Sequence, residues 1–130
     1  MDNSDSGARW TQAGSLLGLI GVGAGAFGAH ALEDLVSPER VAVWETASRY
    51  AMYHALALVA VGLRAQSVDS PHLHRAGIAF LAGAVLFSGS LFALVILDLP
   101  ILGAVTPLGG LSLMVGWVLL FLSGRARPAG

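Results

Sequence analysis

The chain contains no cysteine and no lysine, and only 12% of its 130 residues are charged. Without cysteine it cannot form a disulfide, a thiolate metal site or an iron–sulfur cluster, and it has no thiol nucleophile. Soluble domains carry about 25% charged residues. Half that value, with 55% hydrophobic residues and a mean hydropathy of +0.74, indicates an integral membrane protein that has the lipid bilayer as its first partner.

Basic runs and catalytic motifs are also missing. The formal net charge is −1 and the seven arginines are scattered, which provides no basic surface for nucleic acid. The sequence has no HExxH metal motif, no phosphate-binding loop and no GxSxG nucleophile motif. We therefore predict that the protein is not an enzyme and holds no metal or cofactor.

Long uncharged stretches are the main feature of the chain. The first, residues 10–32, is long enough to cross a hydrocarbon core of about 30 Å as a helix. It is longer than the ~7–15-residue core of a signal peptide, so we expect it to be retained. Further stretches at 42–63, 76–97 and 105–123 predict an all-α fold. That fold is a four-helix transmembrane bundle with short loops, in a single domain that covers residues 1–130.

Capping residues predict where the helices begin. Ser37-Pro38 and Thr106-Pro107 each combine an N-cap residue with a proline at the first helical position. The polar residues 64–75 predict a loop before the third helix, and the apolar residues 101–105 predict an irregular segment. Residues 1–8 are polar, and we expect them to be disordered.

The arginines predict the orientation of the chain. Four spans place both termini on one side, together with Arg9, Arg64, Arg75, Arg125 and Arg127. The other side keeps Arg40 and Arg49. Because the excess of basic residues belongs in the cytoplasm, both termini should be cytoplasmic, in the cell (inner) membrane.

Small residues predict how the helices pack. The glycines of the first stretch are spaced by 4, 3, 4 and 3 residues and form a narrow stripe on one helix face: Gly14, Gly18, Gly21, Gly25 and Gly28. Such a stripe lets another backbone approach closely, and we expect it to be the seam on which the bundle closes. Ser88, Gly109 and Gly110 are further candidates for close helix packing.

A polar cluster at the start of the second helix is the candidate site: His30 on the first helix, and Glu45, Arg49, Tyr50 and His54 on the second. Glu45 precedes Arg49 by four residues, the spacing of a helical ion pair. With Trp44 at the membrane boundary, this pair is predicted to lie at the interface, although a substrate or proton site is an alternative. His30 and His54 would differ in depth by about 12 Å, so we predict packing or hydrogen-bonding roles rather than a shared metal.

Several segments together resemble a known family. They are GAFGAHAL at 25–32, WETASRYAMYHALAL at 44–58, LFSGSLF at 86–92, TPLGG at 106–110 and GW at 116–117. The chain is similar, over nearly its whole length, to the family called domain of unknown function 423. That family includes YgdD- and YwdK-like small bacterial membrane proteins and transmembrane protein 256 of animals. The resemblance implies a four-helix membrane protein and supplies no catalytic residues.

Three functions stay open from the sequence. The first is a non-enzymatic structural or accessory protein that packs with itself, as a homo-oligomer, or with a larger membrane complex. The second is a small transporter or channel that uses the polar face of the second helix. The third is a haem- or quinone-binding membrane protein.

Overall fold

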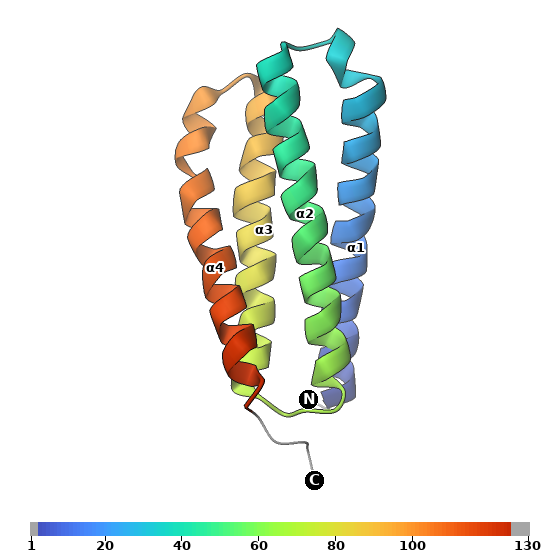
Figure 1. Ribbon diagram of the computed structural model, residues 1–130, viewed down its shortest axis with the longest axis vertical. Coiled ribbons are helices and arrows are strands. Elements are labelled where there is room, and N and C mark those ends of the chain that lie inside the picture. Colours follow the sequence, from blue (N-terminus) through green and yellow to red (C-terminus); the bar gives the residue numbers. More distant parts are fainter. Residues whose placement is uncertain (1–2, 126–130) are drawn as a thin grey trace.

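The computed structural model of the protein describes residues 3–125 and consists of four long helices (Figure 1). They are α1 (Asn3–His30), α2 (Pro38–Ala65), α3 (Pro71–Leu97) and α4 (Thr106–Ser123). Short 3-10 helices lie in two of the connections, η1 (Leu32–Asp34) and η2 (Pro100–Ala104). Successive long helices run antiparallel, so the start of α1, the turn between α2 and α3, and the end of α4 lie at the same end of the molecule. The predicted all-α fold of four helices is confirmed.

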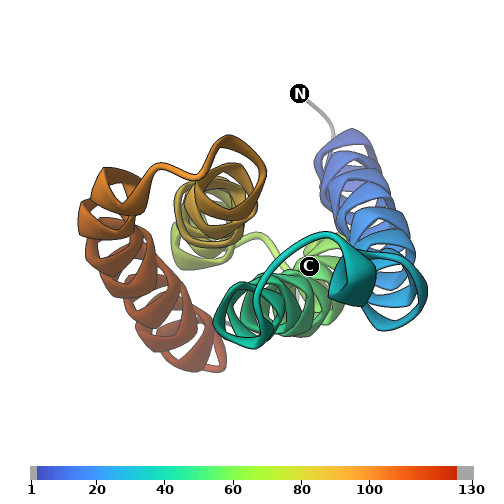
Figure 2. The same ribbon diagram turned by 90° about the horizontal axis from the view of Figure 1, so that it is seen from above.

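The helices form a curved row in which α2 and α3 occupy the middle. α1 packs on α2, α2 on α3, and α3 on α4 (Figure 2). Leu16, Leu19 and Val22 of α1 are 60%, 70% and 62% exposed. The glycine stripe of α1 therefore packs on α2 and is not a seam for the whole bundle, because α1 stands at one edge of the row.

Two clusters of buried residues hold the row together. The larger one joins α2, α3 and α4 in the half of the molecule nearer the α2–α3 turn: Ala57, Leu58, Val61, Leu73, Ala76, Phe80 and Leu113. The smaller one lies near the opposite end and joins η1, α2 and α3: Leu32, Val41, Trp44 and Val95. Both clusters draw residues from α2 and α3, which explains why these two helices are central.

The start of α2 agrees with the sequence prediction. Ser37 is the N-cap residue, its hydroxyl oxygen accepts a hydrogen bond from the Arg40 backbone N–H at 3.4 Å, and Pro38 occupies the first turn. α4 begins differently, because Val105 occupies the N-cap position and no side chain caps the helix. The Thr106 hydroxyl lies 2.8 Å from that of Ser90 and joins α4 to α3 instead.

Three predicted irregular segments are helical in the structure. α1 begins at Asn3, so the expectation of disorder for residues 1–8 is wrong for the described residues 3–8, where Gly7 packs against the backbone oxygen of Gly62. α3 begins at Pro71 rather than at residue 76, and residues 100–104 form η2. Residues 71–75 are polar but helical, so their polarity did not indicate where α3 begins.

Three segments are long and apolar enough to cross a membrane by length and composition. They are Asp5–His30, Pro71–Leu97 and Pro100–Ser123. α2 is as long as α1, with 28 residues, but polar residues such as Arg49 and His54 lower its mean hydropathy. The polar residues of α2 therefore need a structural account of their own.

Candidate functional site: the faces of α2

Arg49 lies near the middle of α2 and not near its end. The midpoint of Pro38–Ala65 falls between residues 51 and 52, so the Arg49 Cα lies about 4 Å from it along the helix axis. Ser88, in the middle part of α3, donates a hydrogen bond from its hydroxyl to the Ala47 carbonyl oxygen at 2.8 Å. Arg49 is nevertheless exposed on the surface of the molecule.

Trp44 is buried and links three helices. It is 7% exposed, and its indole N–H donates to the Ala24 carbonyl oxygen of α1 at 2.7 Å. Its ring packs edge-on against Phe27 of α1 and Phe92 of α3. The burial of Trp44 between helices gives it a packing role, and the position of Glu45 and Arg49 relative to the membrane interface stays a prediction.

Glu45 and Arg49 do not form the expected ion pair. Both side chains are exposed, and within residues 3–125 the one ion pair of the structure joins Arg40 and Asp98. An exposed pair on a helix gains little free energy and restricts two flexible side chains, so spacing alone does not bring the charges together. The outward face of α2 consequently carries one negative and one positive charge, each without an ion-pair partner in the described chain.

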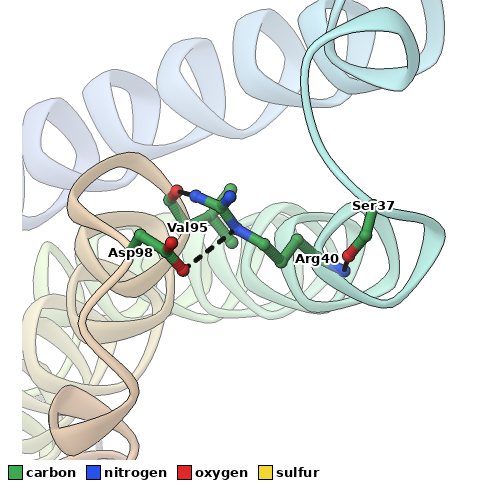
Figure 3. Close-up of polar contacts among 4 residues, drawn as sticks. All are labelled: Ser37, Arg40, Val95 and Asp98. Carbon is green, nitrogen blue, oxygen red and sulfur yellow. Dashed lines mark hydrogen bonds and ion pairs between the residues drawn. The ribbon is translucent and has the colours of Figure 1, made fainter.

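Arg40 joins the first turn of α2 to the end of α3 (Figure 3). One of its terminal nitrogens donates to the Val95 carbonyl oxygen, and its Nε lies 3.8 Å from Oδ1 of Asp98. Asp98 follows the last turn of α3 in the left-handed region, with φ of 52°. A cation at a helix C-terminus satisfies carbonyl groups that have no partner within the helix.

Glu39, which precedes Arg40, places a negative charge in the first turn of α2. The backbone N–H of Glu39 itself and then the Ser37 hydroxyl lower the pKa of the Glu39 carboxyl group. An anion in the first turn also interacts favourably with the helix dipole. Together with Arg40, this residue makes the start of α2 a polar structural element.

His54 points into the molecule and is hydrogen-bonded at both ring nitrogens. It is 4% exposed, its Nδ1 lies 2.7 Å from the Tyr50 carbonyl oxygen, and the Trp117 indole N–H donates to its Nε2 at 3.2 Å. A carbonyl oxygen can only accept and an indole N–H can only donate. These two partners fit a neutral ring that carries its proton on Nδ1.

A pocket of about 450 Å³ lies beside His54 between α2, α3 and α4. Its walls are mostly aromatic and apolar: Tyr50, Tyr53, His54, Phe87, Gly110, Leu113, Met114 and Trp117. Tyr53, Met114 and Trp117 are 51%, 64% and 48% exposed, so the pocket opens to the side of the molecule. Such a volume suits a small apolar ligand.

The structure does not bring His30 and His54 together. His30 is exposed at the end of α1. The nearby Gly28 lies against the Trp44 ring, and Trp44 precedes His54 by ten residues, or about 15 Å of helix. Of the five residues in the predicted polar cluster, Tyr50 and His54 line the pocket, whereas Glu45 and Arg49 lie on the outward face of α2.

The small residues differ in how closely they approach a neighbour. An added Cβ would lie 2.7 Å from the Ala55 oxygen at Gly14 and 2.7 Å from the Trp44 ring at Gly28. The space is wider at the other positions, with 3.6 Å at Gly18, 3.3 Å at Gly21, 4.0 Å at Gly25 and 3.7 Å at Gly110. At Gly109 an added Cβ would meet the backbone of Phe87. All five stripe glycines face α2.

Sequence reasoning missed Arg40 and Trp117. A signal for Arg40 existed, because a cation in the first turn of α2 and Asp98 after α3 lie at the same end of an antiparallel pair. No sequence signal identified Trp117, because its contact with the Phe80 ring and its hydrogen bond to His54 depend on how α4 packs.

These features define a small helical membrane protein with a polar middle helix. The family described as "Protein of unknown function (DUF423)" matches residues 24–110, and the chain belongs to this family. This confirms the resemblance drawn from the sequence.

Named relatives are bacterial membrane proteins. The chain is 41% identical to the UPF0382 membrane protein YwdK of Bacillus subtilis (strain 168) over 111 residues, which cover 85% of this chain and 90% of YwdK. It is 44% identical to a UPF0382 membrane protein of Staphylococcus haemolyticus (strain JCSC1435) over 110 residues, or 85% and 89% of the two chains. No solved structure matches the chain.

Proposed function

We propose that this protein is a non-enzymatic structural or accessory component of the membrane, which packs with itself or with a larger membrane complex. The observation that supports the proposal is Arg49, a charged residue that is exposed near the middle of a helix. Its neighbour on the same face, Glu45, is exposed as well. A protein partner that covers this face would explain why the two charges are there.

The proposal takes all four long helices as membrane spans, with both termini in the cytoplasm. The α2–α3 turn, the start of α1 and the end of α4 share one end of the molecule, and Arg9, Arg64, Arg75 and Arg125 belong to that end. Arg127, which lies outside the described residues, follows in sequence. The excess of arginine at this end supports a cytoplasmic position for both termini.

The depth of Arg49 in the membrane bears on whether its side chain faces lipid or is covered by a protein partner. A helix of 28 residues is about 42 Å long, against a hydrocarbon core of about 30 Å. If α2 is centred in the membrane, a residue about 4 Å from its midpoint lies well inside that core. On insertion scales a charge at this depth costs about 2.5–3.5 kcal/mol, and such residues usually face protein or water.

Neutralising both charges tests the proposal. The double variant Glu45→Gln, Arg49→Gln should keep its thermal midpoint in detergent, because neither residue has an ion-pair partner among residues 3–125. It should lose assembly, measured as particle mass in native membrane nanodiscs. Glu33→Gln, an exposed charge in η1, is the matched control and should assemble normally. A wild-type protein that is monomeric and without partners in nanodiscs contradicts the proposal.

The pocket beside His54 favours a second candidate, the binding of an apolar membrane molecule such as a quinone. Its support is the aromatic lining and the opening to the side at the height of Tyr50 and Trp117. Trp117 fluorescence in a Trp10→Phe, Trp44→Phe background should then fall as a quinone is added to nanodiscs. An unchanged emission at saturating quinone rejects this candidate.

A further inference from the structure

We infer that the partner on the outward face of α2 is a second copy of this chain, with Glu45 of each copy paired to Arg49 of the other. The inference rests on the proposed function, since it names the partner that the assembly would use. It combines three observations: the free face of α2, the signs and spacing of its two charges, and the small residues beside them.

The outward face of α2 is the side left free by the other helices. α1 and α3 pack on its other sides, and α4 adjoins one edge of this face, where Tyr53 and Trp117 line the same pocket. In Figure 2 no helix lies beyond α2 on the side away from α3. Tyr53 is 51% exposed and Leu56 is 64% exposed, and Glu45 and Arg49 are exposed on the same side. This face is therefore open to a partner along most of the helix.

The two charges make the face complementary to itself. Two copies in one membrane have the same orientation, so a two-fold axis along the membrane normal brings the same face of each copy together. Glu45 and the facing Arg49 then differ in height by about 6 Å, one helical turn. Helical side chains lean toward the N-terminus, so Arg49 leans toward the height of Glu45. Each contact occurs twice, and no charge is left over.

Small residues on the same face permit a close approach. Ala42, Thr46, Arg49, Tyr53, Leu56 and Ala60 are spaced by 4, 3, 4, 3 and 4 residues. This is the repeat of two helices that cross at a small angle in a left-handed pair, the commonest arrangement in membrane bundles. Ala42, Thr46 and Ala60 are small and lie among the charged residues and the larger Tyr53 and Leu56. They leave space for the larger side chains of the second copy.

Charge reversal in separate copies tests the pairing. Glu45→Arg puts two positive charges on every copy, and Arg49→Glu puts two negative charges there, so each variant alone should lose dimer by at least about tenfold. Co-expression of the two variants should restore a mixed dimer, because opposite charges then meet across the interface. The variant with both changes in one chain should dimerise as the wild type does. Dimers of each single variant, or no recovery on mixing, would overturn the inference.

Cross-linking locates the interface, which the absence of native cysteine makes simple. Thr46→Cys lies on the proposed contact face and should form a disulfide-linked dimer in native membranes on mild oxidation. Phe121→Cys, at an α4 residue that is 72% exposed, is the matched control and should stay monomeric. Assembly without the Thr46 cross-link refutes the α2 pairing and leaves the proposed function standing. A single copy bound to a different protein in native nanodiscs also refutes the pairing alone, whereas a monomer without any partner refutes both.

Discussion

At the scale of single residues, polar contacts between helices are the most specific features of this molecule. The Ser88 hydroxyl donates to the Ala47 carbonyl oxygen and the Ser112 hydroxyl to that of Ala79, each at 2.8 Å. Apolar contacts alone favour helix–helix packing over helix–lipid packing only weakly, because lipid tails are as apolar as leucine. Side-chain hydrogen bonds therefore help to decide which helices meet and at what height.

Ser88→Ala should lower the free energy of unfolding by about 0.5–2 kcal/mol, because it removes a buried bond between α2 and α3. The measurement is unfolding in mixed detergent followed by helical circular dichroism. Ser15→Ala is the control, since the Ser15 hydroxyl is exposed and bonds only to Thr11 O of its own helix. An equal loss in both variants would mean that the contact with Ala47 contributes nothing.

Residue chemistry could be predicted better than residue contacts. Ser88 and His54 were recognised as packing or hydrogen-bonding residues because polar groups inside a span need partners. The donor to His54 was missed, since the rotation of α4 that brings Trp117 to it depends on packing against Phe80. For Glu45 and Arg49, the spacing of four residues suggested an ion pair within one helix. It could not show that both side chains are exposed and do not contact each other.

At the scale of helices, the contact between α1 and α2 is controlled by the positions where backbones approach. The wheel position of the glycines predicted the stripe, but its five members differ in tightness. An added Cβ would meet a backbone oxygen at 2.7 Å at Gly14, a side-chain carbon at 4.0 Å at Gly25, and nothing within 4 Å at Gly23. A glycine pattern thus predicts a face, whereas the tolerance of each position depends on its neighbour.

Substitution of single glycines by alanine should follow these distances. Gly14→Ala should destabilise the protein by about 1–3 kcal/mol, because the helices must separate to admit the methyl group. Gly25→Ala and Gly23→Ala should be neutral or slightly stabilising, since alanine favours the helix over glycine. Thermal unfolding of the three variants in one detergent gives the order, and the result is contradicted if Gly14→Ala is as stable as Gly23→Ala.

Helix ends were the least predictable part of the elements. Ser37-Pro38 gave the correct start of α2, because the cap is local chemistry. The start of α3 was placed five residues too late, since His72, His74 and Arg75 were attributed to a loop. A helix can continue past the edge of an apolar stretch, so a change in polarity does not mark its first hydrogen-bonded turn.

At the scale of the whole molecule, α2 presents the central question, because it is the least apolar of the four long helices and yet lies in the middle. Its neighbours provide a reason for this arrangement. α1 covers one side through the glycine stripe, Ser88 of α3 bonds to its backbone, and Trp44 reaches across to Ala24. A helix supported in this way can cross the membrane with a polar surface, provided that its outward charges are also covered.

Accessibility of single cysteines determines whether α2 spans. We expect Cys at Ser67, in the α2–α3 turn, and at Ala129, outside the described residues, to react only with a reagent that reaches the cytoplasm. Cys at Glu39, in the first turn of α2, should react only from outside the cell. The comparison of positions 39 and 67 is decisive because α2 alone separates them. Labelling of both from one side would show that α2 lies on or re-enters the membrane, and Arg49 would then need no protein partner.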